Sequence, residues 1–178
     1  GVVSGGILIN DGATLTIYGD ITSLSDKINI KPGGTLILYG NINSISNGIL
    51  VDGGTLEIYS NVTVDGGFEI KASSKMTLNG AYLTVASGNG ILADSSAELE
   101  MYNGSTIEIV DGASKIDNGS NGTITSDNSG NSIETATWDG DRGDFSCASG
   151  TCSDSASSAQ VIITESGGNT VTAESGTS

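Results

Sequence analysis

The sequence contains no histidine, only one proline and only 6 basic residues among 178. Without histidine, the side chain most often used for acid–base catalysis near neutral pH is missing. The 21 acidic residues outnumber the basic ones and give a formal net charge of -15. A surface of that sign repels phosphate backbones and anionic lipid. We therefore expect no nucleic-acid partner.

Long apolar runs are also missing. No segment approaches the roughly 18 apolar residues that a membrane-spanning helix needs, and no charged-then-apolar signal segment opens the chain. We expect no membrane insertion. The chain starts with Gly1 rather than methionine, which fits either a removed export signal or only a boundary set within a longer chain. We favour export.

Turn and strand formers dominate what remains. The chain has 27 glycines and long stretches of Ser, Thr, Asn and Asp, so that good helix formers are scarce. A phrase of the type "LTIYG" recurs, with its first residue at positions 15, 36, 56, 76 and 99, so the offsets are 21, 20, 20 and 23 residues. An apolar triplet precedes each phrase, and another apolar segment follows it, so that the phrase is the second of three apolar segments. Each unit therefore carries three short strands.

Self-similarity with this period is typical of a solenoid, in which each unit buries its apolar face only against its neighbours. The glycine-rich corners "NDGA", "KPGG" and "VDGG" separate the first two strands of a unit. On the phrases of the form "GGTLxI", the chain resembles right-handed parallel β-helix proteins of the pectate-lyase-like and autotransporter-passenger type over roughly residues 6–125. We predict an all-β fold with about five to six coils over residues 1–125, and a Gly/Ser/Asp-rich β-type extension over residues 126–178.

Equivalent residues in stacked coils should form continuous columns along the solenoid. The leucine column is expected in the core and comprises Leu15, Leu36, Leu56, Met76 and Leu99. A tyrosine column comprises Tyr18, Tyr39, Tyr59 and Tyr102, interrupted by Asn79. Stacked rings at a corner would fix the register of neighbouring coils, which we favour over the alternative of a glycan-binding platform.

Asparagine side chains give two further expectations. Asp20, Asn41 and Asn61 share a column, where stacked amides usually bond to one another and to turn backbone. Four triplets also match the N-glycosylation acceptor pattern. Their candidate acceptors are Asn61, Asn103, Asn118 and Asn121.

The middle residue of each first triplet should point outward, and three of these five residues are leucine, namely Leu8, Leu50 and Leu92. A row of outward leucines predicts either a contact surface or a place covered by a C-terminal strand. One apolar run in the C-terminal segment is a candidate for such a strand, and it would either cap its own solenoid or pair with another molecule. This run comprises Val161, Ile162 and Ile163.

Cys147 and Cys152 lie close together in "CASGTC". A small loop of this kind can close as a disulfide in an oxidising compartment, and the alternative is a pair of unreacted thiols. Two thiols without histidine make an incomplete zinc site. Together with the composition, this pair predicts a secreted protein at the cell surface or outside the cell.

Catalysis is not favoured by these residues. The resemblance implies polysaccharide lyases or hydrolases, which use clustered carboxylates with basic helpers and, in the lyases, calcium. This chain has one arginine, Arg142, outside the repeats, and its acidic residues fall mostly at corners. We expect no enzyme and no cofactor, with calcium at acidic corners as a weak alternative.

The termini lead to the functional hypothesis. Only "GVVSG" precedes the first coil, and an uncovered β-helix end presents unpaired backbone donors and acceptors. We predict a non-enzymatic subunit of an extracellular or cell-surface filament that stacks head to tail with copies of itself, partly by strand addition. The alternative is a carbohydrate-binding or adhesive module, and the third candidate is a polysaccharide lyase or hydrolase.

Overall fold

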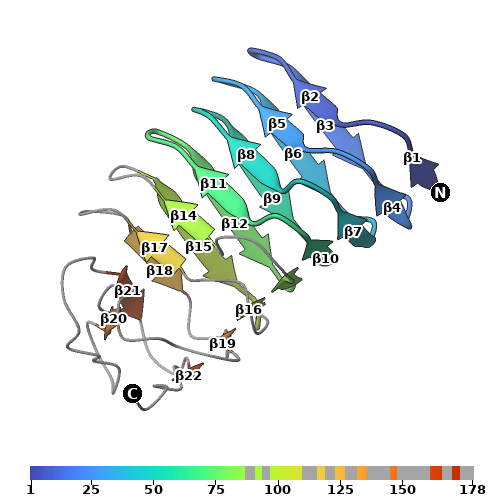
Figure 1. Ribbon diagram of the computed structural model, residues 1–178. Coiled ribbons are helices and arrows are strands. Elements are labelled where there is room, and N and C mark those ends of the chain that lie inside the picture. Colours follow the sequence, from blue (N-terminus) through green and yellow to red (C-terminus); the bar gives the residue numbers. More distant parts are fainter. Residues whose placement is uncertain are drawn as a thin grey trace.

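The computed structural model shows a β-solenoid made of three parallel sheets (Figure 1). The structure describes residues 1–86, 91–93 and 97–109, and beyond them the strands at 116–118, 123–126, 132–135, 145–147, 161–165 and 170–172. No helix occurs in this part of the chain. The predicted all-β parallel solenoid with three strands per coil is confirmed.

Five complete coils follow one another along the solenoid axis, each contributing one strand to each sheet. The first two coils contain β2 (Ile7–Ile9), β3 (Thr14–Ile17), β4 (Ser23–Leu24), β5 (Ile28–Ile30), β6 (Thr35–Leu38) and β7 (Ile42–Ile45). The next three contain β8 (Ile49–Val51), β9 (Thr55–Ile58), β10 (Asn61–Val64), β11 (Phe68–Ile70), β12 (Lys75–Asn79), β13 (Tyr82–Val85), β14 (Ile91–Ala93), β15 (Glu98–Tyr102) and β16 (Thr106–Ile109).

Further strands continue the sheets at both ends. β1 (Val2–Val3) precedes the first coil, and the later strands are β17 (Ile116–Asn118), β18 (Thr123–Ser126), β19 (Ser132–Thr135), β20 (Phe145–Cys147), β21 (Val161–Glu165) and β22 (Thr170–Thr172). β19, β21 and β22 therefore carry sheet pairing past residue 125. The described strands past residue 125 lie in the predicted β-type extension, whose boundary with the solenoid stays a prediction.

We name the sheets by their strand order. Sheet A runs β1-β4-β7-β10-β13-β16-β19-β22, sheet B runs β17-β14-β11-β8-β5-β2, and sheet C runs β20-β21-β18-β15-β12-β9-β6-β3. Among the described residues, sheets A and C thus have eight strands each, and sheet B has six. In sheet C, β20 is the outermost strand although it precedes β21 in the sequence.

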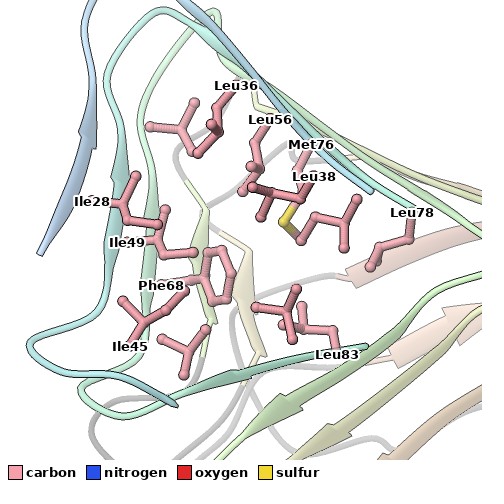
Figure 2. Close-up of a cluster of buried hydrophobic side chains, with 14 of the residues drawn as sticks. Ile28, Leu36, Leu38, Ile45, Ile49, Leu56, Phe68, Met76, Leu78 and Leu83 are labelled. Atoms are coloured by element: carbon pink, nitrogen blue, oxygen red, sulfur yellow. The ribbon is translucent and has the colours of Figure 1, made fainter. Parts of the chain in front are cut away.

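The core lies between the three sheets and consists of stacked columns. Alternate residues of each strand point inward, and Leu36, Leu56 and Met76 pair in register in sheet C and have no exposed surface. Figure 2 shows these three side chains in one column, facing the side chains of Ile28 and Ile49 from sheet B. The predicted leucine ladder is therefore confirmed through the described coils, except that its first member, Leu15, is partly exposed.

Sharp corners between sheets B and C depend on positive backbone φ angles. Gly12, Gly33 and Gly53 occupy equivalent corners with φ of 67°, 71° and 73°, a region that glycine adopts without steric cost. The fourth coil has Ser73 there instead, with φ of 60°. The next residue, Ser74, is buried and ties this corner to the previous coil: its Oγ accepts from Gly53 N at 2.8 Å and donates to Val51 O at 2.9 Å.

Candidate assembly interface

The first coil exposes side chains that are buried in the coils behind it. Leu15 lies in the core column but is 37% exposed, whereas Leu36, its partner in register, is 0% exposed. Ile7 and Ile17 are only partly buried and pack against the edge of the core. The solenoid core is thus open to solvent at this end, beside strands β2 and β3.

The backbone of β3 has a free edge on the same side. Ala13 O and Ile17 O accept bonds from Thr35 N and Tyr39 N of the second coil, so the odd-numbered residues of this segment face that coil. In a parallel strand the backbone groups of alternate residues point to opposite sides. The N–H and C=O groups of Thr14 and Thr16 therefore point away from the second coil, to a side where the described residues place no strand.

β2 repeats this arrangement in sheet B. Ile7 N donates to Lys27 O at 3.1 Å, and Ile9 O accepts from Lys31 N at 2.9 Å. The backbone groups of Leu8 between them point to the free edge, since β2 is the last strand of its sheet. Among the described residues, the outer edges of β2 and β3 are therefore unpaired at the N-terminal end, and we call these two edges the open rim.

Sheet A differs from the sequence expectation, because the residues before the first coil cover its edge. β1 pairs in parallel with β4, and Ser25 N donates to Val3 O at 3.2 Å. The expectation of an uncovered first coil is therefore wrong for this sheet. The signal was present in the sequence: "VSGGILI" at residues 3–9 matches "VDGGFEI" at residues 64–70, which places Val3 in the column of Leu24 and Val64.

The outward column of sheet B forms as predicted. Leu8, Asn29, Leu50 and Glu69 pair in register on consecutive strands. Leu8 is 57% exposed, while Asn29 and Leu50 are half-buried. The side-chain amide oxygen Oδ1 of Asn29 is buried and has no hydrogen-bond partner among the described residues. The backbone of Leu92 continues the column, and its side chain lies outside the described residues.

The apolar run of the C-terminal segment forms part of β21, inside sheet C. β21 contains Val161, Ile162 and Ile163 and pairs with β18 on one side and with β20 on the other. Ile162, for example, lies in register with Thr123 of β18 and with Ser146 of β20. Both backbone edges of β21 are therefore occupied within the molecule. The pairing of Ile162 and its neighbours with β18 lies within the molecule and fits the capping alternative, but this strand does not cover the outward leucines of sheet B.

The free edge of sheet C at this end belongs instead to β20, which contains Cys147. This strand is paired only on the side of β21 among the described residues. Cys152, the second cysteine, lies outside the described residues. The disulfide therefore stays a prediction.

The tyrosines form a stack at the corner after sheet C. The ring centroids of Tyr18 and Tyr39 are 5.2 Å apart with an interplanar angle of 6°, and those of Tyr39 and Tyr59 are 4.7 Å apart at 23°. Offset stacking of this kind stabilises neighbouring coils against each other. Stacking covers the ring faces that the tyrosines turn toward one another. A sugar ring would therefore contact the ring edges and the outer face of Tyr18, a residue that is 76% exposed.

Tyr59 also bonds to a carboxylate beside it. Its hydroxyl donates to Glu57 Oε2 at 3.0 Å, and this bond, with partial burial and the negative charge of Glu57, raises the pKa of Tyr59. On the same face of sheet C, Lys75 Nζ lies 2.9 Å from Glu100 Oε1, and the hydrogen bond to Glu100 raises the pKa of Lys75. Such exposed pairs contribute little to stability.

The polar ladder predicted beside the tyrosines is present. Asp20 Oδ1 accepts from Asn41 N at 2.8 Å and from Asn41 Nδ2 at 3.2 Å, and Asn41 Oδ1 accepts from Asn61 N at 3.0 Å. The side chains of Asp20 and Asn41 therefore each accept a hydrogen bond from a backbone N–H group of the next coil.

The candidate glycosylation acceptors have different positions. Asn61 is exposed at the start of β10. Asn103 is exposed at a corner, and its Nδ2 donates to Asn79 Oδ1. Asn118 ends β17, with its side chain outside the described residues, and Asn121 lies outside them altogether. Glycosylation stays a prediction.

The described residues form neither a metal-binding cluster nor a membrane-spanning helix. Within them, no group of three or more His, Cys, Asp or Glu side chains is arranged to hold a metal ion. Across the same residues, no helix is long and apolar enough to cross a membrane. No protein-family model matches the chain, and no curated protein or solved structure matches it either.

Proposed function

We propose that this protein is a non-enzymatic structural subunit of an extracellular or cell-surface filament, built by end-to-end addition of β-solenoids. The observation that carries the proposal is the open rim, where Leu15 is 37% exposed and the edges of β2 and β3 have no partner among the described residues. Unpaired parallel edges are templates for another strand. A contact between two different ends of a subunit does not close on itself, and it gives an open fibre.

The geometry of the rim favours a β-coil as its occupant. Both free edges belong to parallel sheets, and a further coil would continue both of them with the same strand spacing of about 4.8 Å. The same coil would cover Leu15 and extend the apolar core. A globular partner without such a coil would satisfy neither the backbone groups nor the exposed core.

Sedimentation and negative-stain electron microscopy of the purified protein at physiological calcium and salt test this function. We expect the protein to sediment as fibres whose width matches one solenoid. A protein that remains monomeric across a range of concentrations under these conditions would contradict the proposal. Repeating the measurement with a calcium chelator separates assembly by strand addition from assembly that needs calcium.

A second candidate function is carbohydrate binding, favoured by the exposed outer face of Tyr18. Aromatic faces pack against sugar rings, and Tyr18 stands at the end of the stack. Glycan-array binding that is lost in Tyr18→Ala, Tyr39→Ala and Tyr59→Ala would support this candidate. An array with no binding at all would remove it.

A further inference from the structure

We propose that the tyrosine stack is a site of oxidative cross-linking, at which Tyr39 and Tyr59 join through a carbon–carbon bond between their rings to form dityrosine. The co-reactants are a peroxide, as the oxidant, and a haem peroxidase that delivers it in one-electron steps. The bond would fasten the second coil to the third and, as a disulfide does, restrict the unfolded chain. This inference is independent of the proposed filament, because the residues that it uses all lie in one chain and within the described coils.

The arrangement of the rings favours this pair over the other stacked pair. The ring centroids of Tyr39 and Tyr59 are 4.7 Å apart, against 5.2 Å for Tyr18 and Tyr39. The closer pair is also tilted by 23°, which brings one edge of each ring nearer to the other ring, whereas the wider pair is almost parallel at 6°. Tyr59 N donates to Leu38 O at 2.8 Å, and this bond holds the two side chains beside each other. Radicals formed on this pair therefore need not diffuse to meet.

Tyr59 has a proton acceptor beside its hydroxyl group. This hydroxyl donates to Glu57 Oε2 at 3.0 Å. A phenol that loses an electron becomes strongly acidic, so its proton passes to a base that is already hydrogen-bonded to it. The positions equivalent to Glu57 in the first two coils hold Thr16 and Ile37, neither of which is a carboxylate. Within the described residues, Tyr59 is thus the member of the stack at which oxidation and proton transfer are coupled most directly.

The stack is also accessible to an oxidant and lies outside the packed core. Tyr18 and Tyr39 are exposed, and Tyr59 is half-buried. A peroxidase would therefore oxidise one of the two exposed rings first. An electron passes readily between rings in contact, so the oxidation reaches Tyr59, where the proton has its acceptor. Because the rings lie at a corner, they can tilt further toward each other without disturbing the leucine column.

The reaction balances with one hydrogen peroxide for each cross-link. Each tyrosine gives up one electron and its phenolic proton, and the peroxide takes up the two electrons and two protons to become two molecules of water. The two tyrosyl radicals then form a carbon–carbon bond between ring positions next to the hydroxyl groups. The hydrogen on each of these carbons moves to the phenolic oxygen, which restores both aromatic rings. The product has two hydrogen atoms fewer than the two tyrosines.

Treatment of the whole protein with hydrogen peroxide and a haem peroxidase, at concentrations below assembly, tests the site. We expect single molecules to acquire the fluorescence of dityrosine and to lose two hydrogen atoms in mass, and peptide mapping to join Tyr39 to Tyr59. Tyr39→Phe and Tyr59→Phe should each lose this link completely, although both keep an aromatic ring in the stack. Tyr18→Phe is the matched control and should retain the link. Circular dichroism checks that each variant is folded.

Glu57→Gln tests the proton transfer separately, because its amide oxygen still accepts a hydrogen bond but is a much weaker base. We expect the rate of cross-linking to fall by about tenfold, and an unchanged rate would overturn the role of Glu57. A treated protein that forms no dityrosine, that forms it only between molecules, or that joins Tyr18 to Tyr39 in higher yield would overturn the site. These outcomes leave the filament untouched, since its assembly is measured on the untreated protein.

Discussion

The first and second coils have nearly the same sequence pattern but different surroundings. Leu15 and Leu36 occupy the same column, yet 37% of one side chain is exposed and none of the other. Within its own coil, each leucine has the same kinds of neighbours. The difference in exposure arises because the first coil covers Leu36, whereas no described coil covers Leu15. In this fold a residue is stabilised mainly by the adjacent coils, and an end coil is therefore the natural site for association.

The largest expected effect comes from truncating the core column at these two positions. Leu36→Ala should lower the free energy of unfolding by about 2–5 kcal/mol, since it leaves a cavity between two coils. Leu15→Ala should cost about 1 kcal/mol in the unassembled protein, because solvent already reaches that side chain. Urea unfolding at concentrations below assembly measures both. Equal losses of unfolding free energy in the two variants would show that Leu15 is as well covered as Leu36, and would contradict an open first coil.

Gly19 and Gly40 occupy the same corner before sheet A in the first and second coils, and they provide another comparison of these two coils. A Cβ added to Gly40 would overlap the carbonyl group of Gly19 in the coil in front, whereas a Cβ added to Gly19 would meet nothing within 4 Å. Gly40→Ala should therefore destabilise the protein by about 1–3 kcal/mol, as overpacking does. Gly19→Ala should change stability by less than about 0.5 kcal/mol in the unassembled protein. Thermal unfolding of the pair measures the difference, and a destabilising Gly19→Ala would break the comparison.

Ser74 and Ser25 each bond to backbone groups near a corner, and replacing Ser74 should destabilise the protein more than replacing Ser25. Ser74→Ala removes the buried hydrogen bond to Val51 O and leaves the half-buried N–H of Gly53 without its acceptor, which should cost about 1–3 kcal/mol. Ser25 accepts from Gly5 N near the open end, where the bond is exposed and water replaces it. Ser25→Ala should therefore cost less than about 1 kcal/mol. Chemical denaturation of both variants checks the order, and a larger loss for Ser25→Ala would contradict it.

The smallest effect concerns the tyrosine stack. Glu57 raises the pKa of Tyr59 above 10.0, and the first coil has Thr16 at the equivalent position. Glu57→Thr should lower the pKa of Tyr59 toward 10.0, as followed by ultraviolet absorbance. Because the folded protein holds this proton more tightly, the associated stability is present below pH 10.0 and is lost as the pH rises through the raised pKa. The variant should lose less stability above pH 10.0, and an unchanged titration would contradict the assigned hydrogen bond.

Much of the fold was accessible from the sequence because a solenoid repeats local information. The alternation in "TLIL" and "TLEI" fixes which residues of sheet C face the core, and the spacing of the phrase fixes which residues stack. The columns of Leu36 and Tyr39 followed from these two facts alone. β1 was not predicted from the sequence, because the match between residues 3–9 and 64–70 begins in the middle of a repeat.

The open rim could be predicted only in part. The repeat predicts strands with unpaired edges in the first described coil, but the strand order at the other end of the sheets depends on strands that pair out of sequence order. β20 precedes β21 in the chain and lies outside it in sheet C, and no local pattern announces this placement. The apolar run around Ile162 identified a strand, but not the two neighbours that enclose it. Long-range pairing of single strands is the information that a period of about 21 residues does not contain.

The strand direction and spacing in the assembled fibre, measured by cryo-electron microscopy, test the central claim most directly. Addition of one β-solenoid to the open rim of another predicts strands that run across the fibre axis and repeat about every 4.8 Å along it. Fibres whose strands do not run across the axis, or a protein that forms no fibres, would contradict the account.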